Sequence, residues 1–249
     1  MTNRARAVIF DLDGTLIDSM GGFFDMVING LNRKGVKTSN RLINRIGAEL
    51  IKDYWFKTSK QGIGLIFKLF WKIGRRAGLS RFKALLFTLE CVNKARKIYY
   101  SAPLFPNVVE SLKSLQSAGF QLGIYTLASR KQLLKTLIKH NLTEFFNPDG
   151  LISRNDVKKI KPDPEGLFLA LKGCSVSPSN GTFLGDMPLD IITGTRAGVT
   201  TIALTTGLVG RKMFQQHSQP VMIFESIEYA SKWILQTQLP EDQRNLDPD

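Results

Sequence analysis

Two aspartates stand two positions apart, directly after an apolar run near the start of the chain. Residues 8–16 read VIFDLDGTL, so Asp11 and Asp13 flank Leu12 at the end of a segment with the composition of a strand buried on both faces. On an extended chain, side chains two positions apart point the same way, while Leu12 points into the core. Two converging carboxylates repel each other unless a cation lies between them or one is protonated. The pattern therefore predicts a metal site, and a simple turn before Gly14 is the plainer alternative.

Three further segments carry polar side chains at comparable points. Asp186 and Asp190 occur in GDMPLD after a short apolar run, Thr126 ends the run QLGIYT, and Lys161 stands in KPDPE just before a predicted helix. Carboxylates suit a hard divalent cation such as Mg²⁺, and an ammonium or a hydroxyl can bind phosphoryl oxygens. Together the four segments indicate a site for a phosphate group and a metal ion.

These side chains need a scaffold that brings strand ends to one edge, and the pattern after residue 101 provides one. Apolar runs alternate with helical periodicity, which predicts a doubly wound parallel α/β sheet with right-handed crossovers. In such a sheet, ligands bind beyond the carboxyl ends of the strands. The expected strands are 7–10, 121–126, 150–153, 182–184, 200–204 and 221–224, and the expected helices are 107–118, 129–142, 164–173, 189–197 and 226–236.

The segment 19–100 does not alternate, and it predicts an inserted helical cap domain with helices at 20–33, 41–57, 63–76 and 81–100. It holds 17 Lys and Arg but four Asp and Glu, so it accounts for the whole net charge of +13. We expect residues 1–18 and 101–238 to form the α/β core. The polar tail 239–249 is expected to be disordered. The two cysteines and the missing signal peptide favour a cytoplasmic setting.

DLDGTLIDS, then Thr126, then Lys161-Pro162, then Gly185-Asp186 with Asp190, in this order and spacing, resembles the haloacid dehalogenase (HAD) superfamily. The resemblance covers residues 7 to about 210 and is strongest to phosphoglycolate-phosphatase-like members with a helical cap. It implies an HAD-like Rossmannoid core and a Mg²⁺-dependent phosphatase that hydrolyses a small phosphate monoester, such as phosphoglycolate, a nucleotide or a sugar phosphate.

The resemblance also implies roles for the acidic residues. Asp11 would be the nucleophile that forms an aspartyl-phosphate, and Asp13 would be the general acid and then the general base. Mg²⁺ would be held by Asp11, the backbone carbonyl of Asp13 and Asp186, with Asp190 in or just behind that shell. As an alternative, Asp190 only supplies a negative charge at a helix N-terminus.

Four residues would bind the substrate by the same resemblance. The Thr126 hydroxyl and the Leu127 backbone N–H would hold a phosphoryl oxygen, Lys161 would balance charge, and Arg45 in the cap would contact the leaving group. The plainer alternatives are that Thr126 only satisfies backbone groups and that Lys161 and Arg45 are surface residues.

Two other functions fit parts of the sequence. A phosphomutase of the beta-phosphoglucomutase type keeps the same core residues and differs in shielding the aspartyl-phosphate from water. A membrane- or nucleic-acid-associated protein would use the basic cap, above all the amphipathic stretch GIGLIFKLFWKIGRR at residues 62–76. We expect that stretch to be a cap helix with its apolar face inward, and we expect no stable nucleic-acid partner.

Overall fold

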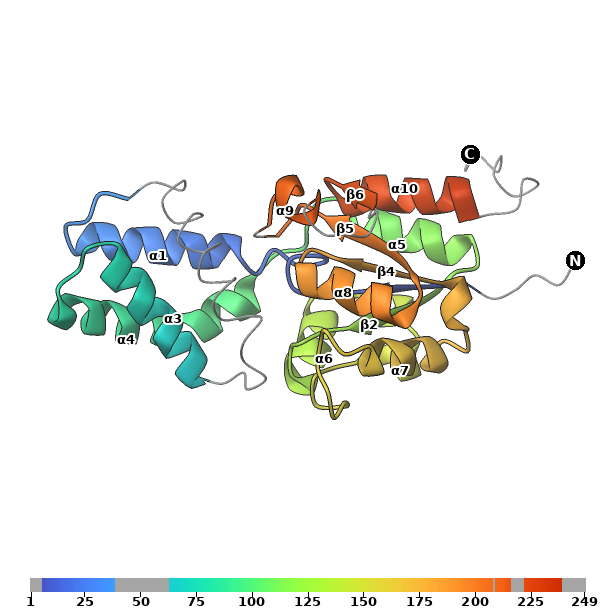
Figure 1. Ribbon diagram of the computed structural model, residues 1–249, viewed down its shortest axis with the longest axis horizontal. Coiled ribbons are helices and arrows are strands. Elements are labelled where there is room, and N and C mark those ends of the chain that lie inside the picture. Colours follow the sequence, from blue (N-terminus) through green and yellow to red (C-terminus); the bar gives the residue numbers. More distant parts are fainter. Residues whose placement is uncertain (1–5, 39–62, 208, 216–221, 239–249) are drawn as a thin grey trace, which may run out of the picture. The chain divides into compact units, whose positions relative to one another are not determined.

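The computed structural model describes residues 6–38, 63–207, 209–215 and 222–238 (Figure 1). The chain divides into two compact units. One unit comprises Met1–Ile17 and Leu104–Asp249, and the other comprises Asp18–Pro103. We call them the α/β unit and the helical unit.

The α/β unit is built on a single six-stranded sheet with the order β3-β2-β1-β4-β5-β6. Every neighbouring pair is parallel, which confirms the predicted fold class. All four residues of β1 are buried, as expected for a strand covered on both faces. The strands are β1 (Ala7–Phe10), β2 (Gln121–Tyr125), β3 (Leu151–Ile152), β4 (Gly181–Gly185), β5 (Thr200–Leu204) and β6 (Met222–Phe224).

Helices cover both faces of this sheet: α5 and α10 lie side by side on one face, and α7 and α8 lie on the other (Figure 1). The face under α7 is an apolar core that includes Ile9, Tyr125, Leu167, Ala170 and Phe183. The helices are α5 (Val108–Ser117), α6 (Arg130–Lys139), α7 (Glu165–Gly173), α8 (Pro188–Ala197), α9 (Arg211–Gln215) and α10 (Ile227–Gln238), with short 3₁₀ turns at Thr143–Phe145, Pro148–Gly150 and Pro178–Asn180.

Helix α6 shows which boundary the sequence predicts and which it does not. Ser129 caps its N-terminus, and its side chain forms a reciprocal capping box with Gln132, as the expected N-cap predicts. The helix ends at Lys139 rather than at residue 142, because Asn141 adopts a left-handed conformation with φ 55°. The short helix α9 was not predicted.

The helical unit contains α1 (Gly21–Arg33), α3 (Ile63–Arg76) and α4 (Arg81–Ser101). Their shared core includes Val27, Leu31, Phe70, Ile73 and Phe87. Because Phe70 and Ile73 are buried, α3 turns an apolar face inward, as we expected for this basic stretch. The helix predicted at 41–57 lies outside the described residues.

Helix α4 carries a second apolar face that is exposed. Phe82, Leu85, Leu86 and Leu89 recur at helical spacing, and the exposed fraction is 70% for Phe82 and 52% for Leu89. We call these four residues the α4 outer face. In the described part of the chain, every helix is too short or too polar to cross a membrane.

The order of the strands determines where a ligand site can form. Strand β1 lies between β2 and β4, and the chain reverses its direction of travel across the sheet at this point. Phe10 is in register with Ile124 of β2 and Leu184 of β4, so the three strands end at the same level. The residues that follow them therefore meet at the switch point, where open parallel sheets bind ligands.

Candidate active site

Asp11 follows β1 directly and is held by one hydrogen bond of its backbone and one of its side chain. Its N–H donates to the Leu184 carbonyl at 2.8 Å, which continues the β1–β4 ladder by one residue. Its Oδ1 accepts a hydrogen bond from Lys161 Nζ at 2.6 Å. Among the residues that the structure describes, none donates to Oδ2. This second oxygen is therefore available to a ligand.

Asp186 follows β4, and its carboxylate packs against the backbone of two glycines, Gly14 and Gly207. Its Oδ1 accepts a hydrogen bond from the Thr15 hydroxyl at 3.2 Å. A Cβ added at Gly14 would lie 2.2 Å from Asp186 Oδ2, and one added at Gly207 would lie 1.8 Å from the same atom. Glycine at these two positions lets the chain close around the carboxylate.

Asp190 is the third residue of α8, and both of its oxygens have partners in the protein. Oδ2 accepts the Met187 N–H at 3.0 Å, and Oδ1 accepts Lys161 Nζ at 2.7 Å. Asp190 therefore does cap the first turn of the helix, as the plainer alternative held, but it also holds the lysine.

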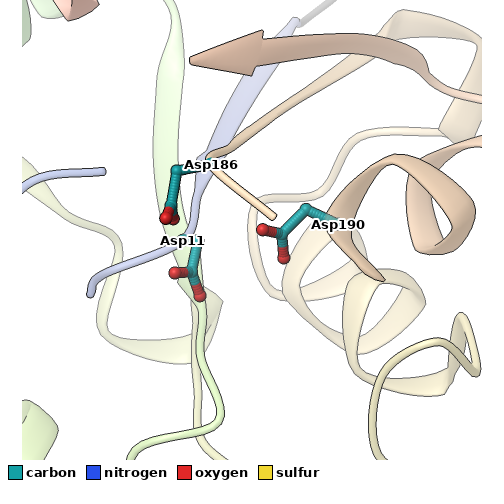
Figure 2. A group of neighbouring side chains, drawn as sticks. All are labelled: Asp11, Asp186 and Asp190. Carbon is teal, nitrogen blue, oxygen red and sulfur yellow. The ribbon is translucent and has the colours of Figure 1, made fainter. Parts of the chain in front are cut away.

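The three carboxylates form one buried cluster. Each of Asp11, Asp186 and Asp190 offers an oxygen within 4.8 Å of the others, so together they could hold a metal ion. Figure 2 shows that Asp11 and Asp186 come from neighbouring strand ends and that Asp190 comes from the start of the adjacent helix. Three carboxylates with one lysine leave the cluster short of positive charge, and oxygen donors of this kind suit a hard divalent cation.

The pKa values of the cluster reflect this shortage. Burial raises the pKa of Asp11 from its ordinary 3.8 to about 7, and the charges of Asp190 and Asp13 add to the rise while Lys161 opposes it. Burial and the charge of Asp11 also raise the pKa of Asp186 well above its usual range. A bound cation would favour the ionised form of both groups.

Lys161 is buried to 2% side-chain exposure, so the alternative of a solvated surface lysine is wrong. Burial alone would lower its pKa, but the charges of Asp11 and Asp190 outweigh burial and raise the pKa. The preceding loop is fixed by Glu165 of α7, whose two carboxylate oxygens accept the backbone N–H groups of Lys158 and Lys159 at 2.9 Å each. Lys161 is thus presented to the cluster by an anchored loop.

The remaining predicted site residues are Thr126, Asp13, Leu127 and Arg45. Thr126 follows β2 and is buried, and its Oγ1 accepts the Ala128 N–H at 3.0 Å, which leaves its own O–H to donate elsewhere. Asp13 is half-buried and close enough to influence Asp11, while Leu127 follows Thr126 at the same sheet edge. The roles expected for these residues stay predictions. Arg45 lies outside the described residues.

Sequence reasoning missed the residues that support Asp186. The Thr15 hydroxyl donates to the Asp186 carboxylate. The Thr206 hydroxyl donates to the Gly14 carbonyl at 2.5 Å and thereby holds the backbone at Gly14 in place. The Gly14-Thr15 pair in DLDGT and the Gly207 that follows β5 were visible in the sequence. A polar residue or glycine just beyond a strand end was the signal that could have identified them.

Comparisons with known proteins identify the family of this chain. The family model of the haloacid dehalogenase-like hydrolases matches residues 8–204. A phosphoglycolate phosphatase from Shigella boydii serotype 4 is 30% identical over 236 residues, covering 89% of each chain. The pyrophosphatase PpaX of Bacillus cereus strain B4264 is 31% identical over 119 residues, which cover 48% of this chain and 54% of that protein.

Solved structures show the same fold. A candidate beta-phosphoglucomutase from Thermotoga maritima superposes with a TM-score of 0.68 at 19% identity, covering 93% of this chain and 99% of that one. A HAD hydrolase from Entamoeba histolytica superposes with a TM-score of 0.62 at 18% identity, covering 96% and 97%. The family model spans most of the chain, and the Shigella relative matches nearly its full length. This chain therefore belongs to the haloacid dehalogenase-like hydrolases, as a phosphatase-like member.

Proposed function

We propose that this chain is a Mg²⁺-dependent phosphatase that hydrolyses a small phosphate monoester through an aspartyl-phosphate on Asp11. The observation that carries the proposal is the buried cluster in which Lys161 joins Asp11 and Asp190 beside Asp186. The phosphoglycolate phosphatases among its relatives support a small phosphorylated substrate.

Asp11 would act through Oδ2, because Lys161 already occupies Oδ1. In the first step, Oδ2 forms a bond to phosphorus while the bond from phosphorus to the ester oxygen breaks, and Asp13 gives its proton to the departing alkoxide. In the second step, Asp13 takes a proton from water and the water oxygen forms a bond to phosphorus while the bond from phosphorus to Oδ2 breaks. Inorganic phosphate leaves and the Asp11 carboxylate is restored.

The residues around Asp11 would hold the transferring group. Asp11, the backbone carbonyl of Asp13 and Asp186 would hold the Mg²⁺, with Asp190 in or just behind that shell, and the ion would supply positive charge that offsets the charge of the phosphate. The Thr126 hydroxyl and the Leu127 N–H would donate to one phosphoryl oxygen, and Lys161 would donate to another. Arg45 remains our candidate contact for the leaving group.

The test is phosphate release from a panel of phosphate esters with Mg²⁺. We expect turnover by the parent protein and a loss of at least about 10³-fold in Asp11→Asn, because the nucleophile is removed. Asp149→Asn, a change at an exposed aspartate of the same unit, is the matched control. Equal rates in Asp11→Asn and the control would refute the nucleophile, and conversion of a sugar phosphate to its isomer without phosphate release would favour the phosphomutase.

A second, separate proposal concerns the helical unit: its α4 outer face docks on an anionic lipid surface. The face is apolar and exposed, and a shallow groove beside it is lined by Phe67, Lys68, Trp71, Lys72 and Leu85. Helices α3 and α4 contain nine Lys and Arg but a single acidic residue, Glu90, which pairs with lysine and arginine. Apolar side chains among basic ones favour the boundary of an anionic bilayer.

Vesicle sedimentation tests this surface directly. We expect binding to vesicles that contain phosphatidylglycerol, weaker binding at high salt, and none to phosphatidylcholine alone. Leu86→Asp should abolish binding, while Leu134→Asp, at an exposed leucine of α6 in the other unit, should not. Binding to an oligonucleotide but not to vesicles, or self-association that Leu86→Asp removes, would contradict the proposal.

A further inference from the structure

The ammonium of Lys161 lies among two carboxylates and two aromatic rings. Its Nζ is 2.6 Å from Asp11 Oδ1 and 2.7 Å from Asp190 Oδ1. The same atom lies 4.9 Å from the centroid of the Tyr125 ring and 5.0 Å from that of Phe183. Both distances are within the range of a cation–π contact. The lysine is therefore surrounded by protein groups of two kinds.

The two rings come from the strands that flank β1 in the sheet. Tyr125 ends β2 and Phe183 lies within β4, the two neighbours of β1, and both belong to the core under α7. Their ring centroids are 6.5 Å apart with planes tilted by 30°. Gly166 of α7 packs directly on Tyr125, since a Cβ there would lie 2.1 Å from the ring. The packing therefore holds both rings in place against the ammonium.

The rings offset part of the cost of burying the charge of this lysine. An ammonium has three N–H donors, and the two carboxylates accept two of them. A buried charge that has lost its water is costly, and a third acceptor from the protein would stabilise it but would also compete with any ligand. Ring faces attract the cation without accepting a directed hydrogen bond. They stabilise the charge and leave one donor uncommitted.

We propose that Tyr125 and Phe183 are positioning residues that hold the charged Lys161 so that its third N–H points to a phosphoryl oxygen. The proposal rests on the proposed phosphatase function, to which it adds two aromatic residues that act through the lysine. Without the rings, only the two carboxylates would position the ammonium, and its third N–H would no longer be directed at the phosphoryl oxygen. Because the transition state needs this donor more than the bound substrate does, kcat should change more than KM.

A series of fluorinated phenylalanines at position 183 separates this role from simple core packing. Each added fluorine weakens the attraction of the ring face for a cation while the ring stays nearly the same size. We expect kcat for an aryl phosphate to fall stepwise, by roughly five- to tenfold at the trifluorinated ring, with KM within about twofold. Phe146 is the control, since it is buried in the same unit and packs edge-on against Phe10 at 6.2 Å.

Substitutions at Tyr125 give a second, independent series. Tyr125→Phe keeps the ring and should retain kcat within about twofold, whereas Tyr125→Leu removes the ring and should lower kcat by roughly fivefold or more. Equal rates across the fluorinated series at Phe183, or the same decline at Phe146, would overturn the proposal. If Tyr125→Leu does not fold, the fluorinated series still decides, because it preserves size.

A readout without turnover separates this inference from the phosphatase proposal. Ring currents of Tyr125 and Phe183 should shift the Lys161 ε-methylene protons upfield in the NMR spectrum, and Phe183→Leu should remove part of the shift. If the parent protein releases no phosphate but the shift is present, the phosphatase proposal fails and the contact of the two rings with Lys161 is supported. If phosphate is released and Lys161 shows no such shift, the proposed role of the two rings is wrong.

Discussion

Replacing Lys161 with methionine removes the only ammonium that contacts the cluster of Asp11, Asp186 and Asp190 in the described part of the chain. Methionine is nearly as long as lysine and fills much the same space, so the change is mainly one of charge. The variant leaves two carboxylates buried without a cation. Removing one partner of a buried ion pair typically lowers the free energy of unfolding by about 3–5 kcal/mol.

The size of this effect should depend on pH, because the carboxylates can take up protons instead. The pKa of Asp11 is already about 7, and Lys161 is the group that opposes a further rise. In Lys161→Met this pKa rises further, so at pH 5 the carboxyl is protonated in the folded variant and little charge is stranded. At pH 8 the Asp11 carboxyl is ionised in the unfolded state, whereas burial without the lysine opposes its ionisation in the folded variant. The full decrease of about 3–5 kcal/mol in the free energy of unfolding should therefore be measured at pH 8.

The assay is urea denaturation followed by circular dichroism, in EDTA, at pH 5 and pH 8. Lys159→Met is the matched control, since Lys159 is exposed two residues away and a surface change of this kind should stay within about 0.5 kcal/mol. Added Mg²⁺ should recover part of the loss in Lys161→Met, because a divalent cation neutralises the same carboxylates. Equal stability of the two variants at pH 8 in EDTA would refute the assignment of Lys161 as a charged partner of the cluster.

Three further outcomes are expected. Gly14→Ala forces a Cβ toward Asp186 at a position with φ +83°, and it should weaken Mg²⁺ affinity, measured by calorimetry, by roughly 10–100-fold; unchanged affinity would separate Gly14 from the metal site. Thr126→Val removes one donor and should lower kcat by roughly 10²–10³-fold with the fold retained by circular dichroism, and a kcat equal to that of the parent would leave Thr126 a purely structural residue. In EDTA, Tm should fall as pH rises from about 5 to 8, because the raised pKa of Asp11, about 7, means that the folded state must release a proton that the unfolded state has already lost. Mg²⁺ should flatten this dependence, and a Tm that rises with pH in EDTA would contradict the direction of the Asp11 shift.

The architecture of the α/β unit follows from local patterns in the sequence. A parallel strand covered on both faces needs consecutive apolar residues, and it ends where a polar residue reaches the sheet edge, so β1, β2, β4 and β5 are visible as short apolar runs. Helix starts were equally readable where a side chain caps the backbone, as Ser129 does for α6. The helix end at Lys139 was not, because the left-handed turn at Asn141 has no unique sequence signal.

By itself, the sequence determined which chemistry is present: carboxylates, a hydroxyl and a lysine at the ends of strands or the starts of helices, within a chain whose excess positive charge falls in one inserted segment. Only the tertiary structure decided how they are joined. The contacts of Lys161 span 150 residues to Asp11 and 29 to Asp190, and its rings come from two different strands. Such contacts depend on strand register and on how α7 packs over the sheet, and no local pattern of residues encodes either.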